Sequence, residues 1–131
     1  MSGPCDILVV DDEPVVSDAI RLVLGDAGFA VLAVPDVETA LAHPALERCR
    51  LLICDVMLPG LSGLDALRAI RARRPGLPVV MTTGYATPEQ EDLLLASGAT
   101  AFLPKPFDDA ELLALVGRVL PRADAADEER P

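Results

Sequence analysis

Five short apolar segments, each followed by a segment with helical spacing, constrain this chain more than any other feature of its sequence. The segments expected to form strands are residues 6–10, 29–34, 51–55, 77–83 and 100–103. Apart from Asp6 and Thr82 at their ends, those at 6–10, 51–54 and 79–82 are apolar, as is typical of strands buried on both faces of a parallel sheet. Alternating strands and helices predict a single α/β domain with right-handed crossovers.

The intervening helices carry recognisable start signals. Pro14 suits the first turn of the first helix, and Gly28 suits its end. Residues 87–90 and 108–111 have the spacing of a capping box, in which the first side chain accepts a hydrogen bond from the fourth N–H. The N-caps are expected at Asp36, Ser62, Thr87 and Asp108.

Size and charge restrict the class of protein. The chain has 131 residues, enough for one domain, and a formal net charge of −10. Acidic chains repel nucleic-acid phosphates. No apolar run approaches the ~20 residues of a membrane span, and the N-terminus lacks the basic segment of a signal peptide. We therefore expect a cytoplasmic protein that binds neither nucleic acid nor a membrane, with an N-terminal extension (1–5), one domain (6–120) and an acidic tail (121–131).

Polar side chains follow the buried strands at the sheet edge where ligands bind in open parallel sheets. Taken singly, each has an ordinary structural explanation, because an Asp after a strand is usually a cap or turn residue and a lone Lys is usually solvated. Their joint placement at one edge predicts a site. The residues concerned are Asp11, Asp12, Asp55, Thr82, Thr83 and Lys105.

The chemistry of such a cluster requires a cation. Two like charges ~4 Å apart repel by about 4 kcal/mol at an effective dielectric near 20, and a hard divalent ion such as Mg²⁺ suits carboxylate ligands. Lys105 is the only lysine in the chain; its compact charge suits phosphate binding, and the Lys105–Pro106 bond is a candidate cis peptide. A carboxylate that accepts a phosphoryl group forms an aspartyl phosphate.

With these residues in place, the sequence resembles the receiver domains of response regulators in bacterial two-component signalling. The matching motifs are "ILVVDDEP", "LLICDVMLPGLSG", "VVMTTGYA" and "FLPKPF", and the resemblance covers about residues 6–120. It implies a flavodoxin-like, doubly wound (βα)5 fold with a five-stranded parallel sheet in the order 2-1-3-4-5. The implied function is to take a phosphoryl group from a sensor histidine kinase or histidine phosphotransfer protein, and then to bind a downstream protein of unknown identity.

The resemblance assigns the catalytic and switch residues. It implies that Asp55 is the phosphoacceptor and that Lys105 and Thr83 bind phosphoryl oxygens. Phe102 stands at the position of an aromatic side chain that turns inward as Thr83 moves, so Thr83 and Phe102 would form the switch.

The resemblance also assigns the metal ligands. Asp12 and Asp55 would bind Mg²⁺ directly, Asp11 mainly through water, and Met57 through its backbone carbonyl. In this family the positions of Met57 and Tyr85 tune the lifetime of the phosphoryl group. Because neither residue offers a carboxylate or an amide to position water, we expect slow self-dephosphorylation.

The first helix is expected to present a docking face for the phosphoryl donor. Its core stripe is expected at Val16, Ala19, Ile20 and Val23, by helical spacing. This leaves an outer flank of Val15, Asp18 and Leu22. A single exposed leucine is common in soluble proteins, so Leu22 also has an ordinary explanation. The expected oligomeric state is a monomer or a weak homodimer.

Other functions compete with this interpretation. A phosphatase of the haloacid dehalogenase type would carry DxDx[TV] after the first strand, where this sequence has "DDEP". A flavin-binding domain is disfavoured by the acidic first loop and the absence of Trp. The main alternative is a receiver-like protein-interaction module that is never phosphorylated. We expect no enzyme acting on a separate substrate: the protein would catalyse only its own phosphorylation and dephosphorylation. It would be a stand-alone single-domain regulator, with a phosphorelay shuttle or the receiver of a hybrid kinase as the alternatives.

Overall fold

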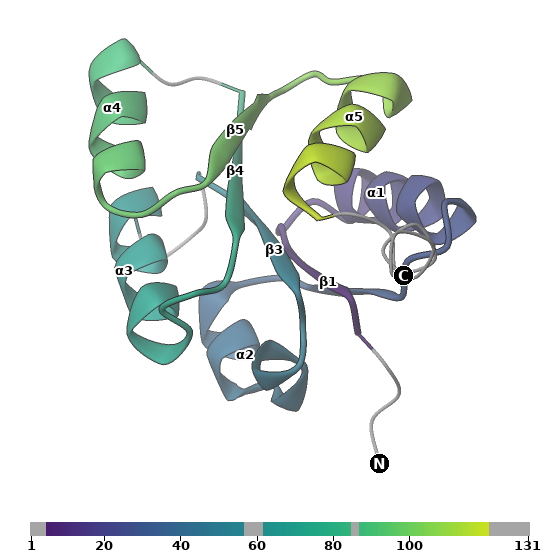
Figure 1. Cartoon of the computed structure of the whole chain (residues 1–131), viewed down its shortest axis with the longest axis horizontal. Helices are drawn as coiled ribbons and strands as arrows, with labels where there is room; N and C mark the ends of the chain where they lie inside the picture. The colour runs from purple at the N-terminus through teal and green to yellow at the C-terminus, as the bar shows by residue number, and fades with distance from the viewer. Residues whose placement is uncertain (1–4, 57–61, 85–86, 121–131) are drawn as a thin grey trace, which may run out of the picture.

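The structure is a computed structural model that describes residues 5–56, 62–84 and 87–120. Five parallel strands form one sheet in the order β2-β1-β3-β4-β5 (Figure 1), which is the predicted flavodoxin-like order. The strands are β1 (Ile7–Val10), β2 (Val31–Val34), β3 (Leu51–Asp55), β4 (Val79–Thr83) and β5 (Ala101–Pro104). The helices are α1 (Pro14–Asp26), α2 (Val37–Ala42), α3 (Gly63–Arg73), α4 (Pro88–Ala96) and α5 (Asp109–Val119), with a 3-10 helix η1 (Pro44–Glu47).

The helices form a layer on each face of the sheet. α1 and α5 lie side by side on one face, and α2, α3 and α4 cover the other (Figure 1). Successive strand residues point to opposite faces, so β3 places Ile53 in the core beneath α1 and α5 and Cys54 in the other core. Every residue of β1, β3 and β4 is buried, as their uninterrupted apolar runs predicted.

The predicted helix caps are present. The Asp36 carboxylate accepts a hydrogen bond from the Thr39 N–H at 2.7 Å, and the Ser62 hydroxyl accepts one from the Asp65 N–H at 3.1 Å. Both predicted capping boxes, at the starts of α4 and α5, are complete. None of the helices in the described part of the chain has the length and apolar character that a membrane crossing requires.

The buried stripe of α1 differs from the prediction. Ser17, Ile20 and Leu24 are buried, whereas Ala19, predicted to face the core, is exposed. The spacing 17, 20, 24 is itself helical, so periodicity fits either stripe. Ser17 can be buried because its hydroxyl donates to the Pro14 carbonyl at 3.3 Å.

The connection from α2 to β3 contains the 3-10 helix, which was not predicted. His43 is half-buried, and its Nδ1 accepts a hydrogen bond from the Ala45 N–H at 3.0 Å. The imidazole therefore caps this short helix, a local structural role.

Arginines at the end of α3 bind backbone carbonyls of neighbouring loops. Arg71 donates to the carbonyls of Gly98, after α4, and Leu77, before β4. Gly98 has a φ of +115°, and a Cβ added there would lie 2.8 Å from the Arg71 side chain. A cation at the C-terminal end of a helix is favoured by the helix dipole, and here Arg71 also joins α3 to the loop after α4.

Candidate functional site

Three carboxylates meet at the carboxyl edge of the sheet. β1 and β3 run in register, with Val10 opposite Cys54, so Asp11 and Asp55 emerge side by side. One carboxylate oxygen from each of Asp11, Asp12 and Asp55 lies within 4.8 Å of the other two. Asp11 and Asp55 are each only 4% exposed, whereas Asp12 is exposed. Oxygen ligands at this spacing suit a hard divalent cation such as Mg²⁺.

The ammonium of Lys105 lies against this cluster. Its Nζ is 3.1 Å from Asp11 Oδ2, 3.1 Å from Asp55 Oδ2 and 3.4 Å from Glu13 Oε1. The backbone N–H of Lys105 donates to the Thr83 carbonyl at 2.7 Å, which fixes the start of the side chain beside β4. The Lys105–Pro106 peptide bond is cis. Sequence reasoning had not identified Glu13, although it is the third acid of "DDEP".

The electrostatics of the site shift the pKa values of Asp11 and Lys105 upward. Burial raises the pKa of the Asp11 carboxyl, and the Asp55 charge adds to this rise, while hydrogen bonds from the Glu13 N–H and Lys105 oppose it. Burial alone would lower the pKa of Lys105, but its hydrogen bonds and charge interactions with Asp55 and Asp11 together raise it. The site therefore holds a permanent positive charge beside carboxylates that repel one another.

The predicted switch residues lie on the opposite face of the sheet from Asp55. Thr83 is 3% exposed and ends β4 on the face of Met81, which belongs to the core beneath α2, α3 and α4. Phe102 is half-buried against the same core and pairs with Met81 across β4 and β5. Their switching role stays a prediction. Met57 and Tyr85, with their predicted metal and lifetime roles, lie outside the described residues.

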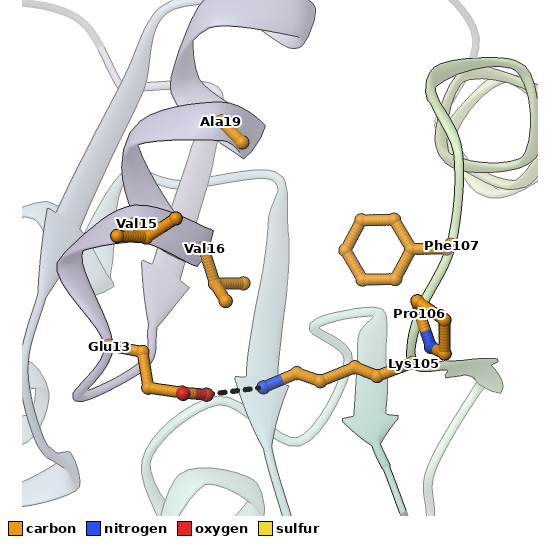
Figure 2. Close-up of a pocket in the computed structure, with 7 residues that line it drawn as sticks. All are labelled: Glu13, Val15, Val16, Ala19, Lys105, Pro106 and Phe107. Atoms are coloured by element: carbon orange, nitrogen blue, oxygen red, sulfur yellow. Dashed lines mark hydrogen bonds and ion pairs between the residues drawn. The ribbon is translucent and has the colours of Figure 1, made fainter.

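An apolar groove opens beside Lys105, between α1 and the loop from β5 to α5. In Figure 2 the Phe107 ring faces Val16 and Ala19 across this groove, and the Glu13–Lys105 ion pair lies at one end. The groove has a volume of about 380 Å³. Its remaining lining residues are Val15 and Pro106.

The predicted docking residues divide between the groove and the open surface of α1. Val15, 82% exposed, lines the groove. Leu22 is 69% exposed, and Asp18 is exposed and pairs with Arg21 at 3.1 Å, but neither lines the groove. Phe107 was missed by sequence reasoning, and its position directly after "PKP" was the available signal.

A family model of the response regulator receiver domain matches residues 7–117. The chain belongs to this family. Among solved structures, this receiver domain is similar to the chemotaxis protein CheY4 of Vibrio cholerae, with a TM-score of 0.83 and 32% identity over 90% of this chain and 100% of that one. It is also similar to the receiver domain of NtrX from Brucella abortus, with a TM-score of 0.81 and 36% identity, again over 90% and 100%.

Curated relatives of this receiver domain differ in length. A 14.6 kDa protein of Leptolyngbya boryana is 38% identical, over 85% of this chain and 86% of that protein. The probable transcriptional regulatory protein TcrX of Mycobacterium tuberculosis is 34% identical, over 91% of this chain but only 51% of TcrX. The chain thus spans about half the length of TcrX, and it spans 26% of the nitrogen assimilation regulatory protein NtrX of Azorhizobium caulinodans.

Proposed function

We propose that this receiver takes a phosphoryl group from a phosphohistidine onto Asp55. The observation that carries the proposal is the Lys105 ammonium, 3.1 Å from both Asp11 and Asp55 within the acid cluster. A buried carboxylate nucleophile, a fixed cation and a set of oxygen ligands are the parts that phosphoryl transfer requires, because the protein contributes mainly position and charge.

In the proposed reaction, an Asp55 carboxylate oxygen attacks the phosphorus of the donor. The P–N bond of the phosphohistidine breaks, and its electron pair returns to the imidazole. Lys105 follows the negative charge from the carboxylate to the phosphoryl oxygens. Thr83, which ends β4 at the edge of the sheet, moves toward the site to donate its hydroxyl to one of them. Mg²⁺, held by Asp11, Asp12 and Asp55, would supply charge neutralisation at the phosphoryl oxygens. The near-complete burial of Asp55 limits access of competing water.

We propose that the donor protein docks on α1 and the apolar groove. A phosphohistidine must reach Asp55 in line with the transferring group, so its carrier must bind next to Lys105. The groove offers apolar walls at Val15 and Phe107 beside that lysine. Leu22 extends the apolar surface along α1. A sensor histidine kinase or a histidine phosphotransfer protein fits this requirement.

Phosphorylation would then change the surface that a downstream protein reads. Thr83 and Phe102 lie beneath α3 and α4, so their movement would alter the face formed by α4, β5 and α5. The two helices that flank this face carry exposed leucines, Leu95 in α4 and Leu113 in α5. In this proposal the protein acts in the cytoplasm as a monomer or weak homodimer, and it catalyses only its own phosphorylation and dephosphorylation.

The test is intact mass after incubation with acetyl phosphate, with and without Mg²⁺, on wild type and Asp55→Ala. We expect one added phosphoryl group that requires Mg²⁺ and is absent from the variant. If wild type gains no phosphoryl group at any time point, from acetyl phosphate or from a panel of phosphorylated histidine phosphotransfer proteins, the proposal is wrong. The receiver-like interaction module would then be the better description.

A further inference from the structure

Thr82 carries a buried hydroxyl with no partner. The residue is 1% exposed, and in the described part of the chain its Oγ1 is the only buried side-chain oxygen or nitrogen that lacks a hydrogen bond. A threonine hydroxyl offers one donor and two acceptor positions. Because burial without a partner disfavours a polar group, nearly all buried hydroxyls are paired. The burial of the Thr82 hydroxyl therefore calls for a partner that the described residues do not supply.

The hydroxyl belongs to the face of the sheet that carries the phosphoryl site. Thr82 stands directly opposite Asp55 in the pairing of β3 with β4. Two residues earlier on each strand, Val80 and Ile53 both lie in the core beneath α1 and α5. Since side chains alternate along a strand, Thr82 and Asp55 share that face. Thr83, one residue further, belongs to the other face.

The backbone around Thr82 also positions both reacting groups. The Thr82 carbonyl accepts the N–H of Val56, the residue after Asp55, at 2.9 Å. The adjacent Thr83 carbonyl accepts the N–H of Lys105 at 2.7 Å. The backbone of Thr82 and Thr83 is thus hydrogen-bonded on one side to the residue after Asp55 and on the other side to Lys105.

We propose that Thr82 is a positioning residue for the phosphorylated state, with its hydroxyl donating a hydrogen bond to the remaining carboxyl oxygen of phosphorylated Asp55. Before phosphorylation, the Lys105 ammonium donates to Asp55 Oδ2 at 3.1 Å. Formation of the aspartyl phosphate moves the negative charge from the carboxylate to the phosphoryl oxygens, and the ammonium follows it. The carboxyl oxygen left behind has two acceptor positions, so it can accept a hydrogen bond from a neutral hydroxyl on the neighbouring strand and still face the Mg²⁺ that Asp55 would help to hold.

This inference rests on the proposed function and extends it. A hydroxyl that is unpaired before phosphorylation and paired after it shifts the equilibrium toward the phosphorylated protein. Removing the hydroxyl should therefore lower the ratio of phosphorylated to unphosphorylated protein, while leaving the unphosphorylated fold as stable as before or more so.

The experiment compares Thr82→Val, which removes the hydroxyl at nearly constant shape, with Thr82→Ser, which keeps it. Thr100→Val is the matched control, because the Thr100 hydroxyl accepts the Val79 N–H at 3.0 Å and serves only the sheet. Three quantities are measured: the phosphorylated ratio at fixed acetyl phosphate and Mg²⁺ by intact mass, the half-life of the phosphoryl group after the donor is removed, and the urea stability of unphosphorylated protein.

We expect Thr82→Val to lower the phosphorylated ratio about three- to tenfold and to shorten the half-life, with no loss of urea stability. Thr82→Ser should restore the wild-type ratio, and Thr100→Val should lose stability at an unchanged ratio. Thr82→Ala serves the same comparison if the valine variant does not fold.

Two outcomes would overturn the inference while leaving the proposed function intact. One is a Thr82→Val protein that is phosphorylated like wild type, within twofold in ratio and half-life. The other is a serine variant that falls as far as the valine variant, since the methyl group rather than the hydroxyl would then be responsible. A wild-type protein that accepts no phosphoryl group would overturn the proposed function, and this inference with it.

Discussion

Replacing Asp11 with Asn should stabilise the metal-free protein, although it removes a partner of Lys105. One Asp11 carboxylate oxygen lies within 4.8 Å of an oxygen of Asp12 and of an oxygen of Asp55, and at that limiting distance each repulsion is worth about 3.5 kcal/mol at an effective dielectric near 20. The attraction between Asp11 and the Lys105 Nζ, 3.1 Å away, contributes about 5 kcal/mol at the same effective dielectric. Because Asp12 is exposed, water and salt weaken its repulsion of Asp11.

These opposing terms nearly balance, and burial of the Asp11 charge decides the sign. Burial raises the pKa of the Asp11 carboxyl in the folded protein, so protonation of Asp11 favours folding. The stability gained from this protonation is complete below the pKa of Asp11 in the unfolded chain. It is lost as the pH rises through the pKa of Asp11 in the folded protein. At neutral pH the ionised Asp11 therefore opposes folding. We expect Asp11→Asn to raise the free energy of unfolding by about 1–2 kcal/mol without metal. Asn keeps the oxygen that accepts the Glu13 N–H at 2.9 Å.

The assay is urea unfolding of wild type and Asp11→Asn at neutral pH, with and without Mg²⁺. Asp92→Asn is the control, because it makes the same charge change at an exposed position of α4. Mg²⁺ should stabilise wild type by mass action, and it should stabilise Asp11→Asn less. The difference in the free energy of unfolding between the two proteins should therefore narrow or change sign. The difference should also shrink as the pH falls through the pKa of Asp11. A metal-free variant that is less stable than wild type would refute the reasoning, because the ion pair with Lys105 would then outweigh burial and repulsion.

Two further predictions concern the scaffold and the groove. Gly98→Ala should lower the free energy of unfolding by about 1–2 kcal/mol, because the φ of +115° and the 2.8 Å approach to Arg71 both disfavour a Cβ; unchanged urea stability would contradict this account. Val15→Glu places a charge on the wall of the groove. It should slow phosphoryl transfer from a phosphohistidine protein at least tenfold more than it slows transfer from acetyl phosphate. Both rates are measured by intact mass. Equal effects on transfer from the two donors would show that the groove is not part of the docking site.

The strands and the acid cluster were predictable because both follow from continuous sequence patterns, whereas the strand order was implied by the resemblance to receiver domains. Uninterrupted apolar runs mark strands buried on both faces, and polar residues directly after such strands must meet at one edge. The buried stripe of α1 was predicted incorrectly at Ala19 because two helical stripes overlap in that segment. The choice between them depends on the Ser17 hydroxyl reaching the Pro14 carbonyl, a contact that hydropathy does not encode.

The groove and the Glu13 contact depend on tertiary placement. Phe107 and Ala19 are 88 residues apart in the sequence, and they line the same groove only because the loop after β5 packs beside α1. From the sequence alone, Glu13 is an ordinary acid at the start of a helix. Its contact with Lys105 follows only from the fold. Local patterns contain no information about either approach.

The most direct test of the account is to locate the phosphoryl group. Borohydride reduces an aspartyl phosphate to homoserine, so reduction after treatment with acetyl phosphate and Mg²⁺, followed by peptide sequencing in the mass spectrometer, identifies the modified residue. The account predicts homoserine at position 55 alone, dependent on Mg²⁺. Modification at Asp11, Asp12 or another carboxylate, with Asp55 unchanged, would contradict the assignment of the buried, lysine-paired Asp55 as the phosphoacceptor.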